Sequence, residues 1–121
     1  MSNLPTRRRW RDYTTRSGHR PVRDFIRTLS DADAAAVVAA MREVAVEGLP
    51  GARHLRGDIY EVRAVGDGAA YRVLFATEGR RAQILLALEA FAKTSQKTPP
   101  RTIQLAERRL RDWRSRSVSR T

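Results

Sequence analysis

The chain has no cysteine, which excludes disulfides, thiolate metal sites and thiol nucleophiles. None of its apolar runs approaches the roughly 20 residues that a membrane-spanning helix needs. No apolar segment follows the basic N-terminal residues, as a secretory signal would require. A Gly-rich phosphate loop followed by Lys is also missing, and the carboxylates lack the spacing of a metal-ligand set. These absences predict a cytoplasmic protein without a metal or cofactor and without a membrane partner.

Lysine is scarce as well, although positive charge is abundant. Lys and Arg number 24 against 13 Asp and Glu, a net charge of +11, yet Lys93 and Lys97 are the only lysines. Such a basic excess is typical of proteins that bind polyanions, above all nucleic acids. Arginine suits that role because its guanidinium forks onto phosphate and stacks on bases. A GC-rich genome would produce the same arginine bias, so both explanations stay open.

The length of 121 residues allows one domain with a core of its own and is too short for two. We expect a single α+β domain over residues 1–121. Within it, a polar and basic arm is predicted at about residues 1–8. The alternation of Arg and Ser predicts a disordered basic tail at about residues 115–121.

The first half of the chain predicts a strand and two helices. Residues 10–15 show the composition and loose alternation of a short strand. Pro21 suits the first position of a helix, and Ser30 is a good N-cap for a second one. Because a single Ser joins these helices, they must fold back as a hairpin. After Pro99-Pro100, apolar residues recur at spacings of three and four, which predicts a C-terminal amphipathic helix.

A Gly-Asp-Gly sequence at residues 66–68 separates two alternating apolar runs, the strongest short-range signal of a β-hairpin. With Asp67-Gly68 as a two-residue loop, Arg63 lies directly opposite Arg72. One face of the hairpin is then wholly apolar, and the other carries the two arginines as neighbours. Since like charges placed opposite each other destabilise a sheet, the pair indicates a bound anion.

A second turn is predicted at Gly79-Arg80, again as a two-residue loop. Its register pairs Phe75 with Ile84 and continues the apolar face across a third strand. The predicted sheet is therefore antiparallel and consists of the N-terminal strand plus a three-stranded meander. The helical hairpin and the C-terminal helix are expected to pack against it.

Polar residues share the arginine side of this predicted sheet. Glu61 and Glu89 project there, and Phe91 and Lys93 leave the third strand on the same side. Cations for a phosphate, together with a ring on which an unstacked base can lie, suit an RNA site. The alternative is a solvated network of ion pairs in which the two glutamates neutralise the arginines.

A second basic cluster, Arg53-His54-Leu55-Arg56, precedes the hairpin. Arg53 and Arg56 are candidates for RNA contacts, as is Lys97 further along the chain. His54 is a candidate general base because an unperturbed imidazole titrates near neutrality. A histidine in a basic loop is more often simply solvated or hydrogen-bonded.

Several segments together resemble the HigB-like branch of the RelE/ParE toxin superfamily, including its phage-encoded members. The resemblance covers roughly residues 10–112 in the family's order. Its segments are residues 18–26, 55–63, 71–75, 91–93 and 97–99, with Ile103, Ala106 and Arg109 in the terminal helix. No single segment is specific, but the combination is.

This resemblance implies a RelE-like toxin of a type II toxin-antitoxin system. Such toxins cleave mRNA in the ribosomal A site and are neutralised by a cognate antitoxin, often of helix-turn-helix type. The implied reaction is metal-independent: a ribose 2′-OH attacks the adjacent phosphate and leaves a 2′,3′-cyclic phosphate. Arg63 and Arg72 match basic positions on the family's active-site sheet, and Lys93 matches one after the last strand. Preplaced cations stabilise the charge that gathers on the phosphate oxygens.

The chain departs from the family's pattern in two places. Residues 90–94 lack one lysine of the Gly-Phe-x-Lys-Lys sequence seen in relatives, and no catalytic tyrosine follows Lys93. Proton transfer would fall to His54, Lys93, Glu61 or the ribosome itself. Two other functions stay open: a ParE-like gyrase poison, for which the basic face is incidental, and a catalytically weak RNA-binding protein.

Overall fold

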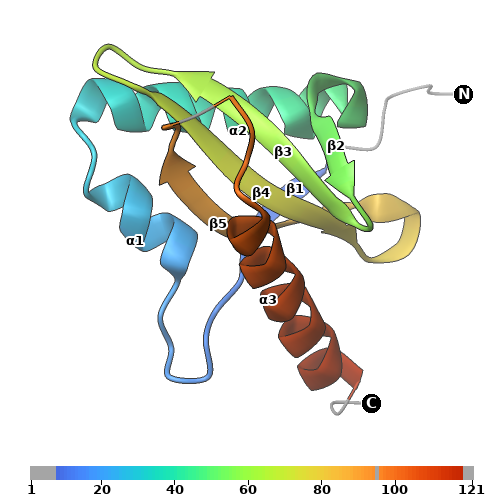
Figure 1. Ribbon diagram of the computed structural model, residues 1–121. Helices are drawn as coiled ribbons and strands as arrows, with labels where there is room; N and C mark the ends of the chain where they lie inside the picture. Colours follow the sequence, from blue (N-terminus) through green and yellow to red (C-terminus); the bar gives the residue numbers. More distant parts are fainter. Residues whose placement is uncertain (1–7, 95, 119–121) are drawn as a thin grey trace, which may run out of the picture.

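The computed structural model describes residues 8–94 and 96–118, and for residues 117 and 118 it describes the backbone alone. Within these residues the chain forms one five-stranded sheet and three α-helices (Figure 1). In chain order the elements are β1 (Arg9–Asp12), α1 (Pro21–Arg27), α2 (Asp31–Glu47), the 3-10 turn η1 (Leu49–Gly51), β2 (Arg53–Arg56), β3 (Ile59–Val65), β4 (Ala70–Glu78), the 3-10 turn η2 (Arg80–Ala82), β5 (Ile84–Ala92) and α3 (Pro100–Val118). None of these helices is long and apolar enough to cross a membrane.

The predicted α+β class, with a helical hairpin and a C-terminal helix around a sheet, is confirmed. The sheet is mixed, however, and not purely antiparallel: its order is β1-β5-β4-β3-β2, and β1 runs parallel to β5. Tight turns dictate antiparallel pairing, whereas β1 joins the rest of the sheet through two helices, a connection long enough for either orientation. The strand β2 at the other edge was not predicted.

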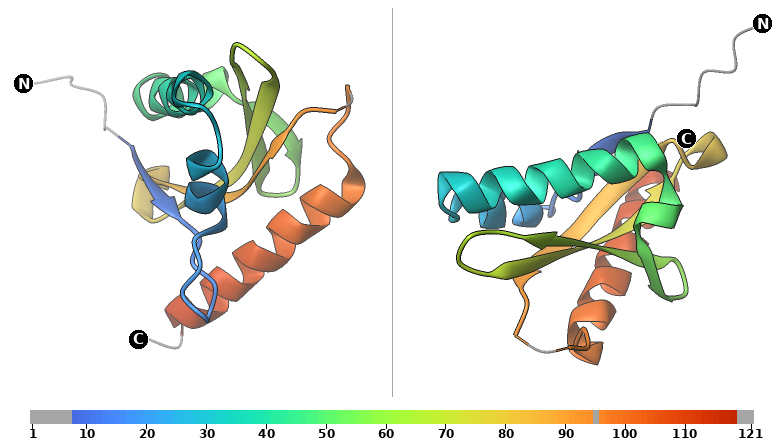
Figure 2. Two further views of the ribbon diagram at one scale, coloured as in Figure 1. Left: turned by 90° about the vertical axis from the view of Figure 1, so that its left-hand side faces the viewer. Right: turned by 90° about the horizontal axis from the view of Figure 1, so that it is seen from above.

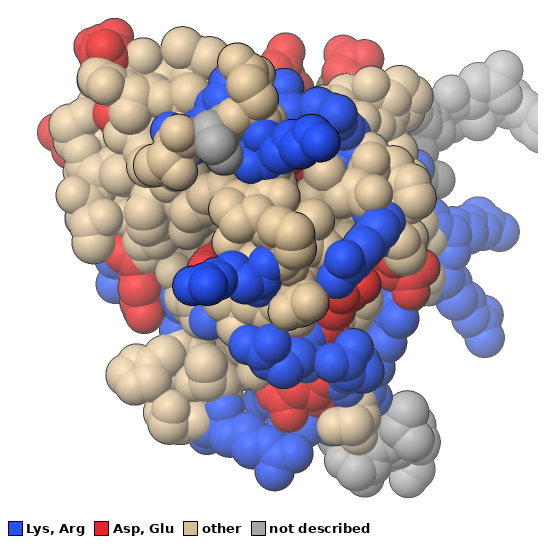
Figure 3. Space-filling view, viewed as in Figure 1, with Lys and Arg blue, Asp and Glu red and all other residues tan. Residues whose placement is uncertain are grey.

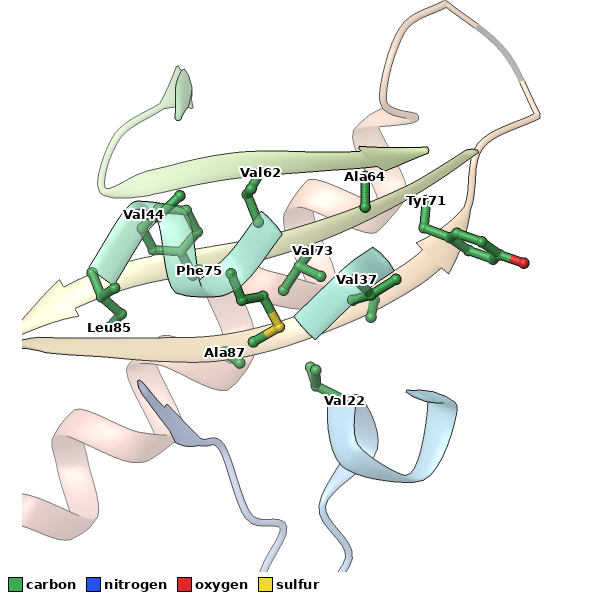
Figure 4. Close-up of a cluster of buried hydrophobic side chains, with 12 residues drawn as sticks. Val22, Val37, Val44, Val62, Ala64, Tyr71, Val73, Phe75, Leu85 and Ala87 are labelled. Atoms are coloured by element: carbon green, nitrogen blue, oxygen red, sulfur yellow. The ribbon is translucent and has the colours of Figure 1, made fainter. Parts of the chain in front are cut away.

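Helices cover both faces of the sheet, so the molecule has three layers (Figure 2). On one face, α1 and α2 enclose an apolar cluster with Val22, Val37 and Phe75 among its buried members (Figure 4). On the other face, α3 packs Ala106 and Leu110 onto the sheet. The two faces are called below the α2 side and the α3 side.

The β3–β4 hairpin has the predicted register, with Arg63 opposite Arg72. The second predicted register is wrong. Instead of a two-residue loop, η2 joins β4 to β5, and Phe75 pairs with Ala87 rather than with Ile84. A bulge leaves Leu88 as an extra residue of β5, because Leu74 pairs with Glu89. Since β5 is apolar on both faces, no hydrophobic pattern could fix its register.

The C-terminal helix is longer than predicted. It extends to Val118, so residues 115–118 are helical rather than part of a disordered tail. Arg116 holds this end of α3, because its guanidinium donates to the carbonyl of Thr14 (2.5 Å) and to Asp112 (2.8 Å). Residues 119–121 and residues 1–7 of the predicted arm lie outside the described residues.

Candidate functional site

A pocket of about 210 Å³ opens on the α3 side, between β2, β3 and the segment that joins β5 to α3. In Figure 1 this segment crosses in front of β3 and β4 before α3 begins. We call the cavity the basic pocket. It is lined by Arg53, Leu55, Glu61, Arg63, Gln96, Lys97, Thr98 and Ile103. Lys and Arg side chains also crowd the surrounding face, which carries α3 (Figure 3).

A buried polar network lies beneath the pocket. Arg72 is 1% exposed, and the side chain of Glu61 is fully buried. The guanidinium of Arg72 donates to the Thr98 hydroxyl (2.8 Å) and to the carbonyl oxygen of Gln96 (2.7 Å). Glu61 Oε2 accepts a hydrogen bond from the Thr98 hydroxyl and lies 3.8 Å from Arg72 Nη1. The network therefore fixes the β5–α3 segment against the sheet.

The cross-strand arginines have different environments. Whereas Arg72 is buried, the Arg63 side chain is 43% exposed at the pocket, and its Nε donates to Glu61 Oε1 (3.0 Å). Glu61 thus lies between the two guanidiniums and offsets the repulsion that the sequence alone suggested. The expected ion-pair network is therefore present for Glu61 alone, because Glu89 pairs with Arg109 of α3 instead (3.1 Å). Arg63 stays accessible to an anion.

Two further cations reach the pocket. Arg53 lies opposite Glu61 in the β2–β3 pairing, so its side chain is on the α3 side with that of Arg63. Lys97 comes from the segment held by Arg72, and it too is exposed. Arg53, Arg63 and Lys97 are therefore brought together from three places in the chain.

The other two members of the first basic cluster lie elsewhere. His54 pairs with Tyr60, and the two ring centroids are 5.0 Å apart on the α2 side of the sheet. Arg56 forms an ion pair with Glu107 of α3 (2.7 Å). The hydrogen bond between them lowers the pKa of Glu107 and raises that of Arg56. Arg56 therefore connects the β2–β3 turn to α3.

Phe91 and Lys93 do not line the pocket. Phe91 pairs with Arg72 and packs, half-buried, against the apolar cluster on the α3 side. Lys93 follows the end of β5, where its backbone N–H donates to the carbonyl of Ala70 (2.8 Å). The apolar parts of the pocket wall come instead from Leu55 and Ile103.

Sequence reasoning did not single out Thr98 or Gln96 as site residues. It placed Glu61 beside the arginines, either as a counter-ion or as one of several groups for proton transfer. Alternation along β3 places Glu61 on the side of Arg63, which hinted at their contact. For Thr98 the sequence held no comparable signal, because its hydrogen bonds form only once the β5–α3 segment folds back over the sheet. The described residues contain no group of His, Asp or Glu suited to a metal ion.

The chain matches the model of a known protein family. The family described as "Phage derived protein Gp49-like (DUF891)" matches residues 24–111. This range runs from α1 into α3 and includes every residue that lines the basic pocket. Curated protein sequences show no significant match to the chain.

Proposed function

The chain belongs to the phage-derived Gp49-like family, a toxin-like family related to the RelE and HigB toxins of type II toxin-antitoxin systems, and on this premise we propose that it is a ribosome-dependent mRNA endoribonuclease. The observation that carries the proposal is the basic pocket. Three exposed cations, Arg53, Arg63 and Lys97, surround a space bordered by the apolar side chains of Leu55 and Ile103. Cations beside an apolar wall suit an RNA phosphate and its neighbouring base.

In the proposed reaction the 2′-oxygen of a ribose forms a bond to the adjacent phosphorus, and the bond from phosphorus to the 5′-oxygen breaks. The 2′-OH gives up its proton, and the departing 5′-oxygen takes one up. Negative charge gathers on the phosphate oxygens in the transition state, where preplaced cations contribute most. Arg63 and Lys97 supply that stabilisation, and Arg53 binds a neighbouring phosphate.

Arg72 acts in this proposal as a positioning residue. Its guanidinium is buried and donates to Thr98 and to the Gln96 carbonyl, so it holds the segment that presents Lys97. His54 takes no part, because its ring lies on the opposite face of the sheet. The chain thus contributes charge stabilisation from a rigid support.

The decisive experiment maps mRNA 5′ ends in cells that express the wild type, Arg63→Ala or Arg27→Ala. Arg27 is an exposed arginine in the last turn of α1 and serves as the matched control for loss of one charge. Removing one preplaced donor typically slows such reactions by about 100- to 1,000-fold. We therefore expect cleavage to disappear with Arg63→Ala and to persist with Arg27→Ala.

A folded Arg63→Ala protein that cleaves mRNA like the wild type would contradict the proposal. DNA damage without mRNA cleavage upon expression of the wild type would instead indicate a gyrase poison. Salt-sensitive RNA binding without cleavage in a translating extract would indicate a binding protein alone.

A further inference from the structure

The bulge in β5 changes which side of the sheet its last residues face. Ala87 and Ala90 pack into the apolar cluster on the α2 side, and Leu88 packs into the cluster on the α3 side. Glu89 also reaches the α3 side, where it pairs with Arg109 of α3. Successive residues of a regular strand alternate between the two faces, so the bulge is what brings two neighbours to one face. Bulges often lie next to active sites, where they redirect the chain.

Arg109 binds both residues of this bulge. Leu88 has no residue opposite it on β4, and β1 ends at Asp12, opposite Ala87. Because Leu88 is fully buried, water cannot reach its carbonyl oxygen. Arg109 Nη1 donates to that oxygen (2.7 Å) and lies 3.1 Å from Glu89 Oε1. Without Arg109 the bulge would hold a buried acceptor that lacks a donor, which is unfavourable.

The bulge fixes where β5 ends. If the strand removed its bulge by sliding, its last residues would move by one position, about 3.3 Å, and would exchange faces. Glu89 would then enter the apolar cluster on the α2 side, and Phe91 would leave its place on the α3 side. The chain that follows β5 would start from a different point.

The chain that follows is the β5–α3 segment, which lines the basic pocket with Lys97. Arg72 holds the middle of this segment through Thr98 and the Gln96 carbonyl. Arg109 connects the two elements at its ends, because it belongs to α3 and binds the bulge of β5. Two buried or largely buried arginines therefore determine the path of the segment.

We propose that Arg109 is a positioning residue for the reaction in the basic pocket. By holding the bulge of β5 against α3, it sets the start of the β5–α3 segment and thereby places the Lys97 ammonium at the pocket with Arg63. Arg109 does not line the pocket, so it acts through Lys97. The proposal rests on the proposed function, because mRNA cleavage is one of its two measurements.

The first measurement is the kinetics of mRNA cleavage on ribosomes by the wild type, Arg109→Met, Arg109→Lys and the control Arg108→Met. Arg108 is the exposed neighbour of Arg109 on α3. We expect Arg109→Met to lower kcat about 100-fold, as for a displacement of about 1 Å. KM is expected to change little, because Arg53 and Arg63 still bind phosphates. Arg109→Lys keeps a charged donor and is expected to restore most of kcat, and Arg108→Met is expected to match the wild type.

The second measurement does not depend on cleavage. Lys93 and Lys97 are the only lysines, so NMR of isotope-labelled methyl groups attached to lysine amines observes Lys97 directly, and Lys93→Arg assigns the signals. A short 2′-O-methylated RNA, which cannot be cleaved, serves as the probe. We expect it to shift the Lys97 signal in the wild type and in Arg108→Met, and to shift it much less in Arg109→Met.

Wild-type kcat in a folded Arg109→Met protein would overturn the proposal, and so would an unaltered response of Lys97 to the RNA. If Arg109→Met does not fold, Glu89→Gln replaces it, because that change removes only the charge at the bulge. A smaller loss of kcat is then expected, and an unchanged kcat would overturn the proposal.

The two measurements also separate the proposal from the proposed function. If Arg109→Met alters the response of Lys97 while the wild type fails to cleave mRNA, the positioning role stands and the nuclease function fails. Equal cleavage by the wild type and Arg109→Met gives the opposite result.

Discussion

Asp33 and Glu61, the two buried carboxylates of the described residues, lie on opposite sides of the sheet and have opposite surroundings. Asp33, in the first turn of α2, accepts hydrogen bonds from the Tyr71 hydroxyl and from the backbone N–H of Asp67 (2.8 Å). Glu61 on β3 lies between Arg63 and Arg72 and accepts from Thr98. The first carboxylate has neutral donors, and the second has cations.

The difference separates a contact that supports the fold from a contact at the candidate site. Asp33 links the tip of the β3–β4 hairpin to α2 and does not line the basic pocket, so its contacts support the fold. Glu61 neutralises a buried guanidinium and also touches an exposed one at the basic pocket. Burying a guanidinium and its carboxylate partner costs free energy of folding. This buried pair lies beneath the basic pocket, which Arg53, Arg63 and Lys97 line.

The largest effect is expected from Glu61→Gln, which leaves the buried Arg72 guanidinium without its carboxylate. Breaking a buried ion pair in this way typically costs about 3–5 kcal/mol of the free energy of unfolding. The control is Glu107→Gln, which removes the carboxylate from a partly exposed pair with Arg56, where the expected cost is about 0–1 kcal/mol. Urea unfolding of both variants measures the difference, and equal costs would remove the distinction between the two sites.

An intermediate effect is expected at the Asp33 contact from Gly66→Ala. A Cβ at Gly66 would overlap the Asp33 carboxylate, so either that carboxylate leaves its hydrogen bonds or the hairpin tip moves away from α2. Overpacking of this kind typically costs about 1–3 kcal/mol. Gly51→Ala is the control, because a Cβ there has nothing within 4 Å. Thermal unfolding measures the melting temperatures of both variants. Equal melting temperatures would show that Asp33 does not hold the tip of the hairpin.

The smallest effect is a dependence on pH. The hydrogen bond from Tyr71 lowers the pKa of Asp33 below its ordinary value of 3.8. The contribution of Asp33 to stability is therefore complete above pH 3.8 and is lost as pH falls through the lowered pKa. We expect Asp33→Asn to melt at a lower temperature than the wild type near neutral pH, with the gap closing in acid. A gap that stays constant into strong acid would contradict this assignment.

The same hydrogen bond raises the pKa of Tyr71 above 10.0. The contribution of Tyr71 is thus complete below pH 10.0 and is lost as pH rises through the raised pKa. Tyr71→Phe is expected to reproduce part of the acid behaviour of Asp33→Asn, because it removes the hydrogen bond that lowers the pKa of Asp33 most.

The sequence predicted those parts of the fold that local chemistry determines. A two-residue turn fixes the pairing on both sides of it, so Arg63 opposite Arg72 was correct. The register of β5 was wrong because η2 replaces a tight turn and because leucines occupy both faces of the strand. The direction of β1 depends on how two helices carry the chain back to the sheet, which no local pattern encodes.

The candidate site was predicted in part for the same reason. Arg53 and Arg63 belong to neighbouring strands, and alternation places them on one side of the sheet. The burial of Arg72 could not be foreseen, because it follows from the β5–α3 segment lying across the strand. Alternation along β2 also separates His54 from Arg53, but no pattern in residues 53–56 indicated a strand.

The hydrogen bond from Arg72 to residue 96 goes to the main-chain oxygen and not to the side chain. Every amino acid supplies that oxygen, so evolution can replace Gln96 without loosening the segment. Gln96 nevertheless lines the basic pocket, and Lys97 follows it in the chain. Anchorage and pocket lining are therefore separate at this single position, where the pocket wall can change by one mutation while the segment stays held.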